Sequence, residues 1–149
     1  MRPRRETIRS NEYAYFVSTQ TAGRKPFFRH ERWARLMLST LAHYDGTGFK
    51  LHAFVVMPDH VHFFCAPAHE QAVPLTNWIR YWKSCVTKKW PRPAEQPLWQ
   101  TDHWDRQLRR EENYAEKWEY VRLNPVRQKL AALPDDWPYQ GELNVLNWR

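Results

Sequence analysis

Two histidines, His60 and His62, stand one residue apart, with Val61 between them. Alternate residues of a β-strand point to the same face of the sheet, so on a strand the two imidazoles lie side by side. Such a pair can chelate one divalent metal ion. The alternative is two ordinary histidines on the polar face of an amphipathic strand. His103 is a further candidate, as a third ligand, a proton shuttle or a surface histidine of a strand.

A second candidate group lies near residue 120, where Tyr120 and Asn124 are four residues apart and share a face if one helix carries both. Glu116 lies on the same stripe, one turn earlier. A tyrosine hydroxyl on a polar stripe can attack a phosphodiester and form a covalent phosphotyrosine. The alternative is a tyrosine at the edge of the interface between helix and sheet. Because Pro125 disfavours helix at Asn124, the helix ends or kinks there, or Asn124 caps a short following helix.

Basic and aromatic residues are interleaved in the segment 77–90, NWIRYWKSCVTKKW. A groove for single-stranded nucleic acid combines cations, which contact phosphates, with rings on which bases stack. The alternative is a solvated basic face over a core rich in tryptophan. Arginines of the first ten residues are candidates for non-specific phosphate contacts. The predicted DNA-binding residues are Arg80, Lys83, Lys88, Lys89, Arg122, Arg127, Arg4 and Arg5.

Two longer runs carry a family resemblance. Residues 52–64, HAFVVMPDHVHFF, resemble the HUH motif of single-tyrosine transposases, in which U is a hydrophobic residue, here Val61. Residues 98–130, LWQTDHWDRQLRREENYAEKWEYVRLNPVRQKL, resemble the C-terminal half of the same proteins. The branch that fits is the REP-associated tyrosine transposases, and the resemblance extends from about Tyr13 to Trp137.

The resemblance implies a DNA transposase or a domesticated, non-mobile relative. It implies that His60 and His62 bind a divalent metal, that Asn124 supplies a third, oxygen ligand, and that Tyr120 is the nucleophile. A hard ion, Mg²⁺ or Mn²⁺, would polarise the scissile phosphate, and the nitrogen ligands favour Mn²⁺. The implied partner is single-stranded DNA beside an imperfect hairpin, cleaved and rejoined through a 5′-phosphotyrosine. Relatives act as monomers or homodimers.

The chain departs from the family pattern at two points. A small residue or glycine usually follows NPVR, as in NPVRAGL, whereas Gln128 and Lys129 stand here, and Asp59 replaces a common asparagine. Neither change removes a catalytic group. Two other functions stay open: a non-catalytic module that binds single-stranded nucleic acid on a ferredoxin-like scaffold, and a rolling-circle replication initiator or relaxase, whose members are usually longer.

The elements that position these residues follow from hydrophobic periodicity. We predict strands over 12–19, 49–57, 60–66 and 99–109, and helices over 29–44, 74–90 and 111–123. The short break at Pro58 implies an antiparallel hairpin between the second and third strands. The order β-α-β-β-α-β with one added helix favours an α+β sandwich, with helices packed on an antiparallel sheet. The resemblance implies the same ferredoxin-like fold.

One buried stripe is predicted on the second helix, because its large apolar residues recur at helical spacing. These residues are Leu75, Ile79, Trp82 and Val86, and the cations of that helix lie mostly off the stripe. The core domain is predicted over 11–133, between a basic arm at 1–10 and a polar, irregular tail at 134–149.

Composition limits the function classes. The 149 residues carry a formal net charge of +7, which favours a polyanionic partner such as nucleic acid or an anionic membrane. The sequence has no apolar run of about 18 residues, so we expect no membrane span. Cys65 and Cys85 are too far apart for a CxxC zinc site and indicate reduced, buried thiols of a cytoplasmic protein. Neither GxGxxG nor a P-loop pattern is present.

Overall fold

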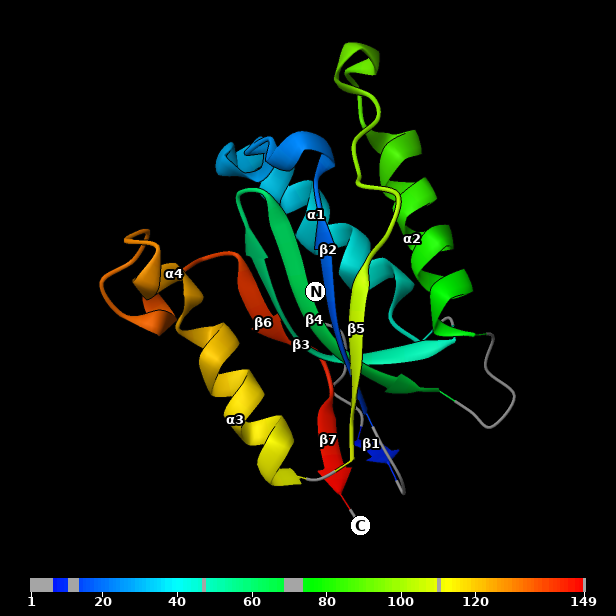
Figure 1. The fold of residues 1–149 in the computed structure, drawn as a ribbon, viewed down its shortest axis with the longest axis vertical. Helices are drawn as coiled ribbons and strands as arrows, with labels where there is room; N and C mark the ends of the chain where they lie inside the picture. Colours follow the sequence, from blue (N-terminus) through cyan, green and yellow to red (C-terminus); the bar gives the residue numbers. More distant parts are fainter. Residues whose placement is uncertain (1–6, 11–13, 47, 69–73, 110, 149) are drawn as a thin grey trace.

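A computed structural model describes residues 7–10, 14–46, 48–68, 74–109 and 111–148. Its centre is one antiparallel sheet of five strands, in the order β5-β2-β4-β3-β6 (Figure 1). The strands are β2 (Ala14–Gln20), β3 (Phe49–Met57), β4 (His60–Pro67), β5 (Trp104–Leu108) and β6 (Gln140–Glu142). Strands β2 to β5 have ferredoxin-like topology, as the sequence predicts, and β3 and β4 form the expected hairpin.

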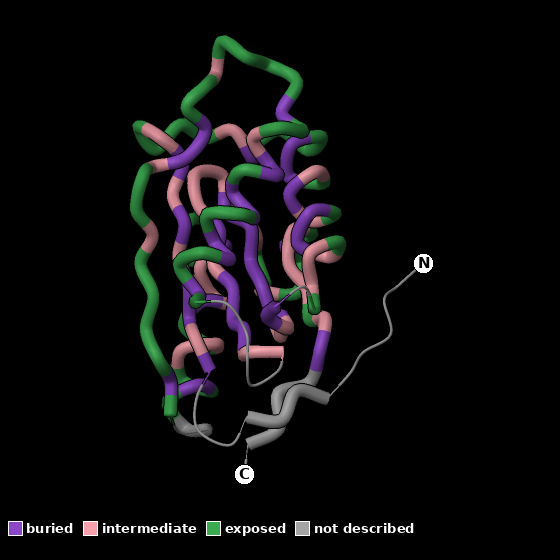
Figure 2. The backbone as a smooth tube through the Cα atoms, turned by 90° about the vertical axis from the view of Figure 1, so that its right-hand side faces the viewer, coloured by how far each residue is buried: buried purple, intermediate pink, exposed green. Residues whose placement is uncertain are grey.

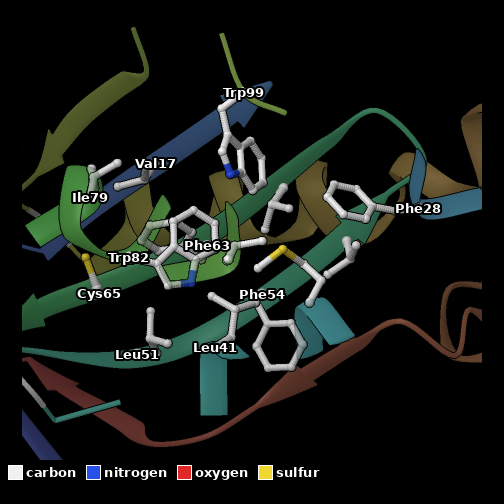
Figure 3. Close-up of a cluster of buried hydrophobic side chains, with 14 of the residues drawn as sticks. Val17, Phe28, Leu41, Leu51, Phe54, Phe63, Cys65, Ile79, Trp82 and Trp99 are labelled. Carbon is white, nitrogen blue, oxygen red and sulfur yellow. The ribbon is translucent and has the colours of Figure 1, made fainter. Parts of the chain in front are cut away.

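Helices α1 (Glu31–Tyr44) and α2 (Leu75–Lys89) are the two crossovers and cover one face of the sheet (Figure 1). Apolar residues at helical spacing on each helix meet the inward residues of the strands, so this face forms the larger core. The predicted stripe of α2 is buried. Figure 3 shows part of this core, with Val17, Phe63, Ile79, Trp82 and Trp99 among its members.

The opposite face is covered by α3 (Glu111–Arg122) and by residues of the C-terminal segment. Tyr114 and Val121 of α3 pack with Phe64 and Leu108 of the sheet. Buried positions follow the strands and the inward sides of the helices (Figure 2). Side chains opposite each other on paired strands share a face. His62 lies opposite a serine of β2 that in turn lies opposite Trp104, so these residues share the α3 face.

The prediction of an irregular tail over 134–149 is wrong. Trp137 is buried, and its Nε1 donates to the carbonyl oxygen of Val56 over 3.1 Å. Strand β6 pairs with β3 and extends the sheet at that edge. Strand β7 (Val145–Trp148) pairs in parallel with β1 (Thr7–Ser10), which belongs to the predicted arm. The segment is ordered for two reasons. Its strand β6 pairs with the free edge of β3, and its residue Trp137 buries an apolar ring against the sheet.

The last strand of the ferredoxin-like unit is shorter than predicted. It begins at Trp104, and Trp99 makes a single bridge with Thr21. Between them the carbonyl oxygens of Gln100 and Asp102 accept hydrogen bonds from Lys83 Nζ over 3.0 and 3.2 Å. The remaining elements are α4 (Asn124–Arg127) and four 3₁₀ helices, η1 (Ala22–Arg24), η2 (Phe27–Arg29), η3 (Pro93–Glu95) and η4 (Pro134–Asp136).

Two expectations from composition concern the described residues. Cys65 and Cys85 are free and buried, as predicted. No helix in the described ranges has both the length and the apolar character that crossing a membrane requires.

Candidate functional site

His60 and His62 lie side by side near the start of β4. Their ring centroids are 4.6 Å apart, and the ring planes make an angle of 77°. This is the arrangement that a strand predicts for alternate residues. His62 stacks on Phe16 of β2, with a centroid distance of 5.3 Å and an interplanar angle of 24°. The neighbouring strand therefore fixes the ring of His62 from one side.

Asp59 orients His60 from the β3–β4 turn. His60 Nδ1 donates to Asp59 Oδ1 over 2.6 Å, and Arg24 Nε donates to Asp59 Oδ2 over 2.9 Å. Burial alone would raise the pKa of Asp59, but the hydrogen bonds from His60 and Arg24 outweigh it and lower the pKa. A carboxylate on Nδ1 leaves Nε2 of the imidazole as the atom that can bind a metal. The exchange of a common asparagine for Asp59 thus supplies a charged partner to His60.

Burial favours the neutral form of both imidazoles. Burial lowers the pKa of His62 to about 3, with further lowering from His60 and from nearby cations. Burial also lowers the pKa of His60, although Asp59 opposes this. Neutral imidazole is the form that ligates a metal. His62 Nδ1 is buried and makes no hydrogen bond to the described residues. This nitrogen therefore has a lone pair or a proton without a protein partner.

A third ligand is not supplied by the usual residue types. In the part of the chain that the structure describes, no group of three or more His, Cys, Asp or Glu side chains could hold a metal ion. His103 therefore does not form such a group with the histidine pair, and its Nε2 pairs with Asp105 Oδ2 over 2.8 Å. A metal site with three protein ligands therefore requires the side-chain oxygen of the predicted third ligand, Asn124.

Tyr120 is the accessible tyrosine of α3. Its exposed fraction is 56%, whereas Tyr114 on the same helix is 7% exposed and its burial raises its pKa. Two cations flank the Tyr120 ring: Lys117 Nζ lies 5.1 Å and the guanidinium carbon of Arg127 lies 4.0 Å from its centroid. A phosphate that approached the Tyr120 hydroxyl would meet positive charge from both neighbours.

The helix that carries Tyr120 is interrupted shortly after it. Helix α3 ends at Arg122, and α4 begins at Asn124 with Leu123 in the N-cap position. Of the arrangements expected at Pro125, the structure has the short following helix, but Asn124 does not cap it. Arg127 reaches back from α4, and its guanidinium donates to the Tyr120 carbonyl oxygen and to Asn124 Oδ1, the latter over 2.6 Å. The oxygen predicted to bind a metal is thus held by Arg127.

The residues after NPVR close α4 with a Schellman motif. Leu130 N donates to the Pro125 carbonyl oxygen over 2.8 Å, and Lys129 N donates to that of Val126 over 3.0 Å. Lys129 has φ of +59°, the left-handed conformation that favours glycine. The family's usual glycine at this place has that physical reason, and here a lysine adopts the same backbone.

Lys117 connects the tyrosine to the histidine pair, and sequence reasoning missed it. Its Nζ lies 4.7 Å from the ring centroid of Phe16, which stacks on His62, and 5.6 Å from that of Trp104. Loss of hydration, together with repulsion from Arg106, lowers the pKa of Lys117. The available signal was its spacing, because a residue three positions before Tyr120 lies on the same helix face.

The predicted DNA-binding residues fall into different environments. Lys83 is buried and donates to two backbone carbonyls, so the prediction that it lies off the buried stripe is wrong: its long stem fills the core while Nζ finds acceptors. Arg122 pairs with Glu119 and Asp135. Exposed positions on α2 hold Arg80, Lys88 and Lys89, and Arg4 and Arg5 lie outside the described residues.

No protein-family model matches the chain. A candidate REP-associated tyrosine transposase of Haemophilus influenzae is 26% identical over 114 residues, which are 68% of this chain and 62% of that protein. A REP-associated tyrosine transposase of Escherichia coli K12 is 23% identical over 92 residues, 61% of this chain and 53% of that protein. The comparisons support the REP-associated tyrosine transposase family. The matched region spans between about half and three fifths of the length of these curated relatives.

Solved structures show the same fold. A REP-associated tyrosine transposase bound to a REP hairpin superposes with a TM-score of 0.70 at 20% identity, covering 94% of this chain and 81% of that one. A transposase candidate from Deinococcus radiodurans R1 gives a TM-score of 0.54 at 21% identity, covering 81% of this chain and 95% of that one. The chain therefore shares its α+β architecture with these two solved structures.

Proposed function

We propose that the protein is a tyrosine transposase that cleaves and rejoins single-stranded DNA beside a hairpin. The observation that carries the proposal is the environment of Tyr120: an exposed hydroxyl-bearing ring between Lys117 and Arg127, joined through Lys117 and Phe16 to the histidine pair. The likeness to REP-associated tyrosine transposases supports the same assignment.

The reaction is a transesterification. The Tyr120 oxygen attacks the phosphorus, the bond from phosphorus to the 3′ oxygen breaks, and the DNA 5′ end is left on the tyrosine as a phosphotyrosine. The phenol proton passes to solvent, and the released 3′ oxygen takes up a proton as a hydroxyl. In the reverse direction a 3′ hydroxyl of a second strand attacks the phosphotyrosine and restores Tyr120. One phosphodiester is exchanged for another, so the step needs no nucleotide cofactor.

Lys117 and Arg127 supply positive charge around the reacting phosphate. Charge-assisted hydrogen bonds from such donors strengthen as the phosphoryl oxygens gain charge in the transition state. Arg127 also fixes the backbone at Tyr120 and the side chain of Asn124, so it sets the position of the nucleophile relative to α4.

The residues present fit a divalent cation. His60 and His62 would hold it, since both are neutral and His62 Nδ1 is a buried nitrogen without a described partner, and Asn124 would join them once Arg127 releases its oxygen. When bound, Mg²⁺ or Mn²⁺ acts as a Lewis acid that polarises the scissile phosphate. Asp59 keeps the ring of His60 in the orientation that this requires.

The proposed substrate is an unpaired strand next to a hairpin. One solved relative is described as bound to a REP hairpin, and the positive charge of this chain suits a phosphate backbone. An unpaired strand also spares the free energy of opening a duplex at the cleavage site.

The test is covalent capture on a denaturing gel. End-labelled hairpin strands from the chain's own genomic neighbourhood are incubated with Mn²⁺ or Mg²⁺, or with EDTA. With metal, we expect a protein-linked DNA band for the unmodified chain. The band should be absent when EDTA is added, and absent for Tyr120→Phe and His60→Ala even with metal. Tyr81→Phe is the matched control, because Tyr81 is also 56% exposed but lies on α2. A band that persists in Tyr120→Phe would overturn the assignment of the nucleophile.

One observation favours the alternative of a non-catalytic binding module: Arg127 holds the Asn124 oxygen that is the predicted third ligand. Tight hairpin binding without a covalent band in either metal would support that function instead.

A further inference from the structure

Trp104 stands out on the open part of the α3 face. Its side chain is 48% exposed, although it is a large aromatic residue on a strand. Its ring contacts Phe16 edge-on, with centroids 5.4 Å apart, and Lys117 Nζ lies 5.6 Å from its centroid. The ring is thus held in place from within the protein while about half of it meets solvent. None of the chemistry described above uses it.

A cavity of about 210 Å³ adjoins this ring. Its lining residues are Ser18, Gln20, Gln100, Asp102, His103 and Trp104. Two of the lining residues are strand partners of the histidine pair, because Gln20 lies opposite His60 and Ser18 lies opposite His62. Its polar groups are hydroxyl, amide, imidazole and carboxylate, with no lysine or arginine. This lining suits the edge of a nucleobase and does not suit a phosphate.

A second cavity, of about 260 Å³, lies beside Tyr120 and has the opposite character. It is lined by Arg106, Leu108, Asn113, Glu116, Lys117 and Tyr120. Its two cations, Arg106 and Lys117, outnumber its one carboxylate, Glu116, so the net positive charge suits a phosphate. Trp104 links the two cavities, because it lines the first and its ring centroid lies 5.6 Å from Nζ of Lys117, which lines the second.

We propose that Trp104 is the stacking platform for one unpaired nucleotide next to the scissile phosphate. The base stacks on Trp104 and turns its edge toward Gln20, Gln100 and Asp102, while its phosphate lies toward Arg106 and Lys117. Glutamine can pair with adenine through two hydrogen bonds, and a carboxylate only accepts. The subsite therefore prefers a base with an exocyclic amino group over thymine. This inference rests on the proposed function, because it assigns the sequence preference of the same site.

The test measures binding, so that it does not depend on cleavage. The full chain carrying Tyr120→Phe is titrated into labelled hairpin DNA whose unpaired flanks contain one abasic site, moved position by position. We expect one position at which the abasic site weakens binding roughly ten-fold, the range of stacking on an aromatic ring. Trp104→Ala should weaken binding to intact DNA by a similar factor and remove the sensitivity to that abasic site. Trp104→Phe, which keeps an aromatic ring, should retain most of the binding and most of the sensitivity.

Two further variants keep the test decisive if Trp104→Ala does not fold. Gln20→Ala should reduce the preference for an amino-bearing base over thymine at the sensitive position. Leu133→Ala, which removes another exposed apolar side chain, should leave binding and its abasic sensitivity unchanged. If Trp104→Ala and the abasic site weaken binding independently, so that their fold-losses multiply when combined, the inference is overturned.

Failure of the inference is distinguishable from failure of the proposed function. If the chain with Tyr120 intact forms a covalent adduct but shows no coupling between Trp104 and an abasic site, only the nucleotide subsite is refuted. If the coupling is present and no adduct forms, Trp104 stacks on an unpaired base of the hairpin DNA, and the cleavage function is refuted.

Discussion

The guanidinium carbon of Arg127 lies 4.0 Å from the centroid of the Tyr120 ring, and the same group holds the amide oxygen of Asn124. One cation therefore contacts both the proposed nucleophile and the proposed third metal ligand. Arg127 belongs to the short helix α4, which begins at Asn124, two residues after α3 ends at Arg122.

Arg127→Gln should slow formation of the covalent adduct by roughly a hundred-fold, which is typical of losing one donor that stabilises transition-state charge. The measurement is single-turnover cleavage of a hairpin substrate. Arg35→Gln is the control, because Arg35 is an exposed arginine of α1 paired with Glu31. Equal rates for Arg127→Gln and the unmodified chain would exclude a role for this contact.

Lys129→Gly should stabilise the protein by about 0.5–1 kcal/mol. The residue has φ of +59°, where an L side chain is strained and glycine is not, although glycine also gains freedom in the unfolded chain. Urea unfolding measures the difference. Gln128→Gly, one residue earlier with φ of −84°, should instead lose stability. Equal losses of stability in the two variants would show that the backbone at Lys129 is not strained.

The metal-free protein should lose stability as the pH falls below about 6.5. The pKa of His62 is about 3 in the folded state, against 6.5 for an ordinary exposed histidine, so between these values the unfolded state binds the proton. The free energy of unfolding then falls by up to about 1.4 kcal/mol for each pH unit. His62→Gln should remove about 1.5 kcal/mol of the loss between pH 6.5 and 5, measured by urea unfolding in EDTA. Parallel pH profiles for the two proteins would show that His62 is protonated equally in both states.

Trp137→Ala should cost about 3–5 kcal/mol of folding free energy. The ring is buried, and its Nε1 hydrogen bond to Val56 is lost with it. Leu133→Ala, whose side chain is 63% exposed, should change stability by less than about 0.5 kcal/mol. Thermal or urea unfolding compares the two. A small effect of Trp137→Ala would mean that the segment after residue 133 contributes little to the fold.

Local periodicity was enough to predict the central elements. The apolar run bounded by Gly48 and Pro58 predicts β3 with its observed bounds, and the alternation after it places His60 and His62 on one face. The strand β6 could not be predicted in this way, because it has three residues and its partner on β3 is more than eighty positions away.

The contacts of long side chains were also beyond local patterns. The sequence predicts a solvated cation at Lys83, but its Nζ is satisfied by carbonyls of Gln100 and Asp102 that only the tertiary fold brings near. The link from Lys117 through Phe16 to His62 likewise joins two elements that are remote in sequence. The helix face that Lys117 shares with Tyr120 could be predicted locally, but its partner on β2 could not.

The most direct test of the central claim is to locate the DNA linkage by mass spectrometry. The covalent adduct is trapped with Mn²⁺, digested with nuclease and protease, and the modified peptide is sequenced. The account predicts a nucleotide phosphate on the Tyr120 oxygen and no adduct in EDTA. A linkage to Tyr114 or to any other residue, or an adduct that forms equally well in Tyr120→Phe, would contradict it.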